Sequence, residues 1–210
     1  MSSPPKRPYL SERRDSAAGA TRSRILTVAK SLFALHGIDG VTVARIGRDA
    51  GVAGSTVYAL FKSKEGILRA LMTAALFGPR FQAAQSLLSG TTDAARLIAL
   101  SAHVARAIWE SEGSDLGLLR GAVGFSPSLR ALEQEFEDLR FAMQEDRVRL
   151  LFAQSRARRS LDLAAARRIL WMYTSRDIFR MLVHDGGWSP DQYQDWLSRT
   201  LVDALVEPRA

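Results

Sequence analysis

The side chains with the clearest chemistry lie in one short segment, GVAGSTVYALFKSKEG, at residues 51–66. Only Val57, Leu60 and Phe61 recur at the three- and four-residue spacing of a core-facing helix. The other face carries hydroxyl groups and lysines, with no acid before Glu65: Ser55, Thr56, Tyr58, Lys62 and Lys64. Hydroxyls exchange hydrogen bonds and lysines attract anions, so this face is suited to a polar, negatively charged surface.

The positive charge of the chain is concentrated around the same segment. The 210 residues carry 29 Lys/Arg and 22 Asp/Glu, a formal net charge of +7. Residues 1–70 hold 12 of the basic and 5 of the acidic side chains, and the rest (29 − 12 and 22 − 5, or 17 of each) cancel. This distribution favours a polyanion-binding module joined to a neutral body, because cations near phosphates release counterions. A basic tail that serves solubility is the alternative.

The helical periodicity around this segment predicts a helix-turn-helix. The spacing indicates helices at 21–36, at 43–50 after the N-cap Thr42, and near 54–60, and a fourth that begins after Ser63. The linker AGVAG between the second and third helices is too short for antiparallel packing, so these two helices cross steeply. In such a motif the later helix projects and enters a major groove of DNA.

This geometry predicts a contact for each polar residue of the segment. Ser55 and Thr56 are expected at base edges or phosphates, whereas tyrosine and lysine side chains suit phosphate oxygens. Thr42 and the N-terminal amides of its helix offer another phosphate site, with Arg45 as an added cation. The expected DNA contacts are Thr42, Arg45, Ala53, Gly54, Ser55, Thr56, Tyr58, Lys62 and Lys64.

Residues 21–72, from RSRILTVAKSLF to STVYALFKSKEGILRALM, resemble the DNA-binding module of the TetR family of bacterial transcription regulators. This chain departs from the family pattern at a few positions. Ala53-Gly54 stand where Ser-Lys is frequent, Leu60 stands where histidine is frequent, and Gly66 replaces a common glutamate. Fewer polar groups then reach the bases, so DNA shape and the N-terminal arm are expected to contribute more to specificity.

The resemblance implies an all-α protein in which an N-terminal three-helix helix-turn-helix domain precedes a helical ligand-binding and dimerisation domain. The expected division is a flexible basic arm at 1–20, the DNA-binding domain at 21–66 and the helical domain at 67–210. Later helical spans are expected near 92–111, 114–123, 127–155, 162–184 and 190–206. Ser126-Pro127 and Ser189-Pro190 have the pattern of N-terminal helix caps.

The resemblance also implies two further sites in the second domain. The last two helices of two subunits would form a four-helix dimer bundle, which sets two recognition helices on successive grooves of a palindrome. The expected interface is Ile178, Phe179, Leu182, Trp196, Leu197, Leu201 and Leu205. An effector pocket would use central aromatics, namely Trp109, Phe125, Phe141, Trp171 and Tyr173, which suit an apolar or aromatic effector. Ordinary core packing is the alternative for both sets.

The sequence offers little for catalysis or metal binding. It has no cysteine and three scattered histidines, so neither a metal site nor a cofactor is expected. It lacks a Gly-rich phosphate loop after a strand and a nucleophile elbow, which argues against an enzyme. No apolar run approaches the roughly 20 residues that cross a bilayer, so a cytoplasmic location is expected.

The predicted function is therefore a dimeric, ligand-responsive repressor that binds a palindromic operator in double-stranded DNA. Two alternatives stay open. One is a helical dimerisation or adaptor protein with a degenerate DNA-binding head, and the other is a small all-α enzyme.

Overall fold

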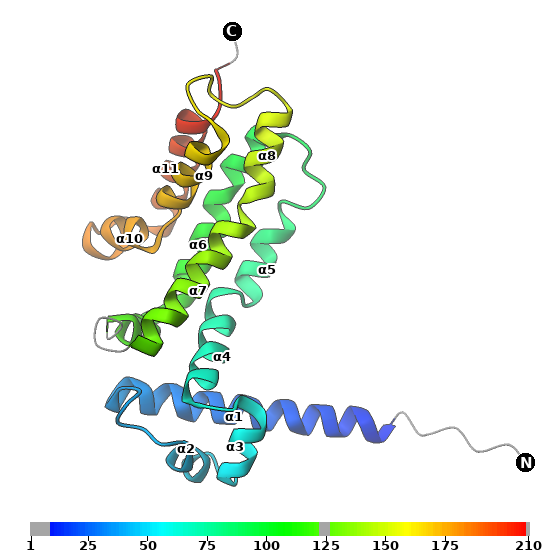
Figure 1. Cartoon of the computed structure of the whole chain (residues 1–210), viewed down its shortest axis with the longest axis vertical. Helices are drawn as coiled ribbons and strands as arrows, with labels where there is room; N and C mark the ends of the chain where they lie inside the picture. Colours follow the sequence, from blue (N-terminus) through cyan, green and yellow to red (C-terminus); the bar gives the residue numbers. More distant parts are fainter. Residues whose placement is uncertain (1–8, 122–126, 209–210) are drawn as a thin grey trace, which may run out of the picture. The chain divides into compact units, whose positions relative to one another are not determined.

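The computed structural model describes residues 9–121 and 127–208, which form helices and contain no strand (Figure 1). The elements are α1 Tyr9–His36, α2 Val43–Asp49, α3 Gly54–Phe61, α4 Lys64–Leu76, α5 Pro79–Ser86, α6 Ala94–Gly121, α7 Pro127–Met143, α8 Glu145–Ala153, α9 Leu163–Tyr173, α10 Arg176–Phe179, the π-helix η2 Arg180–Asp185 and α11 Pro190–Leu205. Within these ranges none of the helices is long and apolar enough to cross a membrane. The all-α prediction is confirmed.

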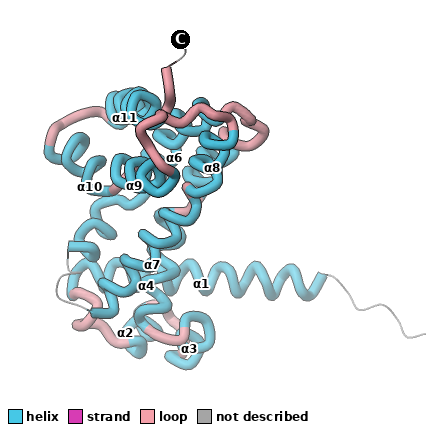
Figure 2. The backbone as a smooth tube through the Cα atoms, turned by 45° about the horizontal axis from the view of Figure 1, so that its top comes forward, coloured by secondary structure: helices cyan, strands magenta, loops and turns pink. Residues whose placement is uncertain are grey.

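Contacts divide the chain into two compact units. The first comprises Met1–Leu71 and Ser114–Phe125, and the second comprises Met72–Gly113 and Ser126–Ala210. In the first unit, α2 contacts both α1 and α3, and the views in Figure 1 and Figure 2 agree that α2 and α3 lie side by side along α1. Its core is apolar and includes Ile25, Ala29, Phe33, Val41, Ile46, Val57, Phe61 and Ile67.

The first helix is longer than the sequence pattern indicated. It begins at Tyr9, so residues 9–20, which were expected in a flexible arm, are helical; residues 1–8 lie outside the described part. The correction has a simple reason, since Pro8 is the last proline before the helix and the alanine-rich stretch 17–20 favours helix. The helix ends as predicted, because Gly37 adopts φ +68 and its N–H donates to Phe33 O at 2.9 Å.

The second unit packs α9 against α7, α8 and α11. Its core includes side chains from every one of these helices: Leu129, Leu132, Phe136, Val148, Leu151, Ala166, Leu170, Tyr193, Leu197, Leu201 and Leu205. The start of α11 follows the predicted cap, because Ser189 Oγ accepts from Gln192 N at 3.1 Å and Gln192 Oε1 accepts from Ser189 N at 2.8 Å. Pro190 occupies the first helical turn, whereas Ser126 lies outside the described residues.

Several helix boundaries beyond residue 78 differ from the expected ones. Helix α5 falls in a stretch for which no helix was expected, and α6 runs unbroken from Ala94 to Gly121 where two helices were expected. The expected helix 127–155 divides at Gln144. The expected helix 162–184 divides after Thr174, whose hydroxyl donates to Leu170 O at 2.7 Å, and Ser175 then caps α10. A hydrogen bond from a side chain to the backbone does not change the spacing of apolar residues, so the sequence pattern could not reveal this break.

Candidate nucleic-acid interface

The helix-turn-helix is held together by close backbone contacts as well as by side chains. The N–H of Val52 donates to Gly47 O at 2.8 Å, and Gly51 turns the chain with φ +66. A Cβ on Gly47 would lie 3.0 Å from Val52 O and 3.3 Å from Gly54 Cα. A larger residue at this position would push α3 away from α2, so glycine sets the crossing of the two helices.

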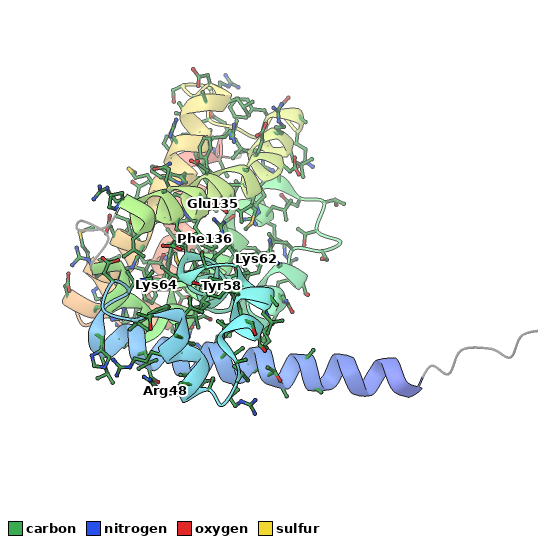
Figure 3. All side chains as sticks on the ribbon, turned by 60° about the horizontal axis from the view of Figure 1, so that its bottom comes forward. Arg48, Tyr58, Lys62, Lys64, Glu135 and Phe136 are labelled. Atoms are coloured by element: carbon green, nitrogen blue, oxygen red, sulfur yellow. The ribbon has the colours of Figure 1, made fainter. Side chains whose placement is uncertain are left out.

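Helix α3 has one buried side and one exposed side. Val57 and Phe61 are buried in the first unit, whereas Ser55 and Tyr58 are exposed, with 55% of the tyrosine surface open. Thr56 is half-buried. Figure 3 shows Tyr58 and Lys62 on this helix and at its end. The sequence prediction of a core side and a polar outer side therefore describes the helix correctly.

The helix ends in a tight turn centred on Lys62. Its φ of 66° and ψ of −37° are unusual for a residue with a side chain, and the N–H of Ser63 donates to Phe61 O at 2.8 Å across it. Lys62 is exposed. The turn therefore holds its ammonium on the outer side, next to the exposed side of α3.

Lys64 has an internal partner that the sequence did not reveal. Its Nζ donates to Ile38 O at 2.9 Å and so joins the start of α4 to the loop after α1. Lys64 was expected as a phosphate contact, which stays a prediction; in this structure it also tethers α4 to the loop, while Lys62 is exposed at the surface. The sequence could not reveal this tether, because the loop carbonyl and the lysine are far apart in the chain.

The start of α4 explains the glycine at position 66. Ser63 Oγ accepts from Gly66 N at 3.1 Å, which is the predicted cap. A Cβ on Gly66 would lie 1.9 Å from Phe61 O, so no glutamate fits here in this conformation. Glu65 faces the helix start instead, and hydrogen bonds from its own N–H and from Ser63 lower its pKa.

The residues of the expected phosphate site at the start of α2 already have partners within the chain. Thr42 caps the helix, since its Oγ1 accepts from Arg45 N at 3.1 Å. The Arg45 guanidinium lies 3.0 Å from His36 Nε2 and 3.8 Å from an Asp49 carboxylate oxygen. Thr42 is exposed and Arg45 half-buried, so a phosphate contact by Arg45 would compete with these partners.

One cation near α3 was missed by sequence reasoning. Arg22 of α1 places its guanidinium 4.6 Å from the centre of the Phe61 ring at the end of α3. Arg22 is itself exposed, so it adds charge beside the turn at Lys62. No local pattern could reveal this, because the two residues come from different helices.

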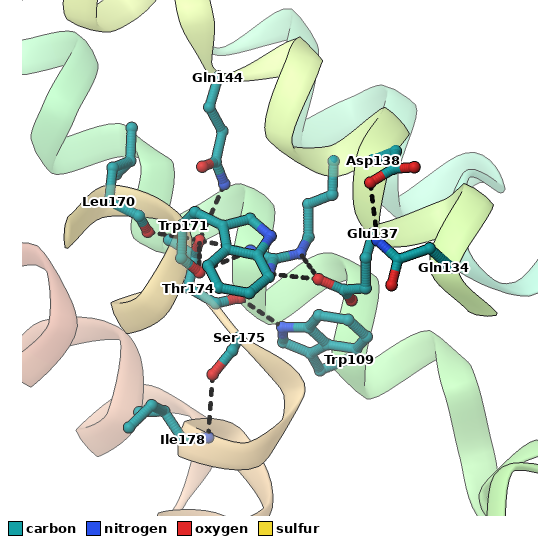
Figure 4. Close-up of polar contacts among 11 residues, drawn as sticks. Trp109, Gln134, Glu137, Asp138, Gln144, Leu170, Trp171, Thr174, Ser175 and Ile178 are labelled. Carbon is teal, nitrogen blue, oxygen red and sulfur yellow. Dashed lines mark hydrogen bonds and ion pairs between the residues drawn. The ribbon is translucent and has the colours of Figure 1, made fainter. Parts of the chain in front are cut away.

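The described aromatics of the expected effector site each have a partner within the chain. Trp109 is buried and donates from Nε1 to Thr174 O at 2.9 Å (Figure 4). Phe141 and Trp171 form an edge-to-face pair with ring centres 6.4 Å apart, whereas Tyr173 pairs with Trp196. Phe125 lies outside the described residues. These partners account for Trp109, Phe141, Trp171 and Tyr173 as packing groups, and their prediction as a ligand lining stays a prediction.

Most of the expected dimer residues lie in the core of one chain. Leu197, Leu201 and Leu205 have no exposed surface and Phe179 has 3%. A side chain with no exposed surface cannot contact a second subunit, so these assignments were wrong. Ile178, Leu182 and Trp196 are half-buried, so their contact with a second subunit stays a prediction. Helix α11 uses its periodic stripe to pack on α9 of the same chain.

The sequence profile of the bacterial regulatory proteins of the tetR family matches residues 25–71, the segment that contains the helix-turn-helix. Residues 25–71 are therefore a DNA-binding module of the TetR type. No curated protein sequence matches the chain significantly.

Solved structures of several transcription regulators share the fold of this chain. NalD of Pseudomonas aeruginosa, the secondary repressor of the MexAB-OprM multidrug efflux pump, is 21% identical with a TM-score of 0.68, covering 91% of this chain and 100% of NalD. FadR of Bacillus subtilis in complex with stearoyl-CoA is 19% identical with a TM-score of 0.63, covering 87% and 98%. The fatty acid degradation regulator FadR of Bacillus halodurans is 18% identical with a TM-score of 0.62, covering 86% and 94%. At these identities the likeness establishes the fold.

Proposed function

We propose that this chain is a transcriptional repressor that binds a palindromic DNA operator as a dimer and leaves it when a small-molecule effector binds. The observation that carries the proposal is the division of α3 into a buried side, with Val57 and Phe61, and an exposed side, with Tyr58. A helix that served only the core would not hold an aromatic hydroxyl and flanking cations in solvent. Repression is favoured because NalD is a repressor with the same fold.

The exposed side of α3 supplies both kinds of DNA contact. Ser55 and Thr56 lie at the N-terminal part of the helix, where base edges are read, and Ala53 and Gly54 let the backbone approach closely. Tyr58 and Lys62, with Arg22 beside them, are placed to contact phosphates and fix the register. Thr42 and Arg45 at the start of α2 would add a phosphate contact at the cost of the internal partners of Arg45.

A second copy of the chain would cover the apolar side chains that stay partly open on the last helices. Met172 and Met181 are each 46% exposed, and Ile178, Leu182 and Trp196 are half-buried. Burying such surface stabilises association in proportion to its area. A two-fold dimer then presents two recognition helices to half-sites one helical turn apart.

The effector would act by binding two arrangements of the dimer with different affinity. FadR of Bacillus subtilis has been solved with stearoyl-CoA, which supports a ligand-binding role for the helical unit of this fold. The relatives with this fold are transcription regulators, so an enzymatic activity is not proposed.

Binding of the full-length chain to duplex DNA across a salt series tests the proposal. Affinity should fall steeply with salt, and selection from random duplexes should yield a palindrome. Lys62→Gly relieves the strained turn yet removes a phosphate contact, so it should weaken binding to all sequences and reduce the salt slope by about 1. Thr56→Ala should instead change the preferred bases.

Arg96→Ala is the matched control, because it removes an exposed cation from α6 of the second unit and should leave DNA affinity unchanged. Absence of salt-dependent binding in the unaltered protein would refute the regulator and favour the adaptor alternative. An effect of Arg96→Ala equal to that of Lys62→Gly would refute the assignment of the interface to α3.

A further inference from the structure

Two residues of α3 point directly away from its buried side. Successive residues of a helix turn by about 100°, so a side chain two positions from another lies on the opposite side. Ser55 and Ala59 each lie two positions from the buried Val57, and Ala59 also lies two positions from the buried Phe61. Both Ser55 and Ala59 are exposed. They therefore form the centre of the outer side of α3, with Tyr58 at its edge.

The outer side of α3 lacks the side chains that identify a base by its polar groups. In the major groove, arginine or lysine identifies guanine, asparagine or glutamine identifies adenine, and glutamate or aspartate identifies cytosine. The helix Gly54–Phe61 contains none of these residue types. Its polar side chains are Ser55, Thr56 and Tyr58, whose hydroxyls exchange hydrogen bonds with any base. Thymine alone also presents a methyl group in this groove, and alanine can contact it without a polar group.

Cations lie beside the outer side of α3 and not at its centre. Lys62 follows the last turn of the helix, and the Arg22 guanidinium lies 4.6 Å from the centre of the Phe61 ring. Arg48 belongs to α2, the helix that crosses the DNA backbone in this motif, and Figure 3 shows it well away from Lys62. Cations in these places suit phosphates, which carry no sequence information. The base edges are left to Ala59 and the hydroxyl groups.

The start of α3 is small without a packing reason. A Cβ on Gly54 would meet only Ala44 Cα, at the ordinary contact distance of 4.0 Å. The φ angle of Gly54 is not positive, so neither packing nor the backbone requires glycine here. Glycine also costs helix stability relative to alanine. A surface that approaches the helix start closely, such as the floor of a major groove, accounts for the missing side chain.

We propose that α3 reads thymine methyl groups, so that each half-site of the operator has A·T pairs at its centre, with Ala59 against the methyl group of one thymine. The inference rests on the proposed function, because it names the bases that the regulator prefers. The methyl contact removes apolar surface from water, and the Ser55 hydroxyl donates to a thymine O4 beside it. Ala59, which was not among the expected DNA contacts, becomes a residue that determines specificity.

Selection from random duplexes by the full-length chain supplies the operator, and a uracil scan of that operator tests the inference. Uracil pairs with adenine and keeps O4 but lacks the methyl group, so it isolates the methyl contact. Uracil in place of the central thymine of a half-site should weaken binding roughly fourfold, the value of one buried methyl group. Uracil outside the palindrome should have no effect. G·C pairs at the centre of both half-sites, or an operator in which no thymine is sensitive to uracil, would overturn the proposal.

Ala59→Gly tests which residue makes the methyl contact. The ratio of the affinities for thymine and uracil operators should fall from about four to about one. Because this ratio compares two duplexes bound by one protein, a loss of helix stability in the variant cancels. Ala83→Gly is the matched control, since it removes an exposed alanine from α5 of the second unit and should keep the ratio. An unchanged ratio in Ala59→Gly would overturn the role of Ala59.

The failure of this inference can be told apart from the failure of the proposed function. The uracil scan uses the unaltered chain, so it decides the question even if Ala59→Gly folds poorly. Specific binding to a palindrome that is insensitive to uracil refutes only this inference. Absence of salt-dependent DNA binding in the unaltered chain refutes the regulator, and this inference with it.

Discussion

The junction of α3 and α4 allows a sharp test, because two helical glycines have opposite surroundings. A Cβ on Gly66 would lie 1.9 Å from the backbone oxygen of Phe61, whereas a Cβ on Gly19 would have nothing within 4 Å. Real Cβ contacts essentially never fall below 3.0 Å, so Gly66→Ala requires a shift of at least 3.0 − 1.9 = 1.1 Å. Gly19→Ala requires none. Gly66→Ala should therefore lower the free energy of unfolding, whereas Gly19→Ala should raise it.

The size of the destabilisation by Gly66→Ala depends on the atoms that the added Cβ displaces. The Phe61 oxygen already accepts from Ser63 N at 2.8 Å, so displacing it also strains the turn at Lys62. Forced overpacking of this kind costs about 1–3 kcal/mol, and a backbone clash should lie at or above the upper end. For a chain of this size, 3 kcal/mol corresponds to a loss of roughly 6–12 °C in Tm. Gly19→Ala should gain up to about 1 kcal/mol through helix propensity.

Thermal and guanidinium unfolding followed by circular dichroism measure both variants. DNA affinity, measured well below the lower Tm, reports whether the junction also positions α3. A Gly66→Ala protein as stable as the unaltered chain would refute the close approach of α4 to the end of α3. Destabilisation by Gly19→Ala of similar size would show that any alanine in the first unit is harmful, and the local argument would fail.

The remaining predictions concern the second unit. Met181→Glu should give a folded monomer by sedimentation, because it charges an exposed apolar side chain of the proposed dimer face; an unchanged dimer mass would refute that face. Leu201→Ala should instead lower the free energy of unfolding by about 2–5 kcal/mol in denaturant titrations, since its side chain is wholly buried in one chain. Burial raises the pKa of Tyr193 above its ordinary 10.0, so the folded state keeps a proton that the unfolded chain releases. The contribution of Tyr193 to stability should therefore be constant below pH 10 and fall as the pH rises above it. Tyr193→Phe should flatten this loss without harm at neutral pH, because the Tyr193 hydroxyl is buried without a partner. An identical pH profile for the two proteins would contradict this.

Local signals predicted the first unit well, and their limits are visible at particular residues. Thr42, Ser63 and Ser189 act as the helix caps that their sequence positions indicated, since capping depends on neighbours within a few residues. The partners of Lys64 and Arg22, Ile38 O and the Phe61 ring, were missed because they come from distant positions. A helix cap depends on residues close to it in the sequence. A tether such as that of Lys64 depends instead on how distant segments pack together.

Periodicity in the second unit could locate buried helix faces but not the surface that buries them. Leu197 and Leu201 repeat at a spacing that fits a core and a dimer interface equally well, and only the contact of α11 with α9 decides between them. The same limit applies to Arg147 of α8, which is buried and donates to the neutral acceptors Ser101 Oγ and Gln85 Oε1. An arginine in a helical sequence is normally exposed, and neither its burial nor the absent counter-charge leaves a trace in the local pattern.

The turn at Lys62 links the fold to the proposed interface in energetic terms. A residue with a side chain at φ 66° and ψ −37° is strained, at a cost of order 1–3 kcal/mol, and glycine would remove most of that cost. The fold alone gives no reason for lysine here, since the structure describes no partner for its ammonium and the side chain is exposed. Gly66, in the same junction, is a glycine at a position where a Cβ would clash with the backbone. The strain at Lys62 is therefore best explained by a use for the cation itself, and the proposed phosphate contact beside α3 would supply that use.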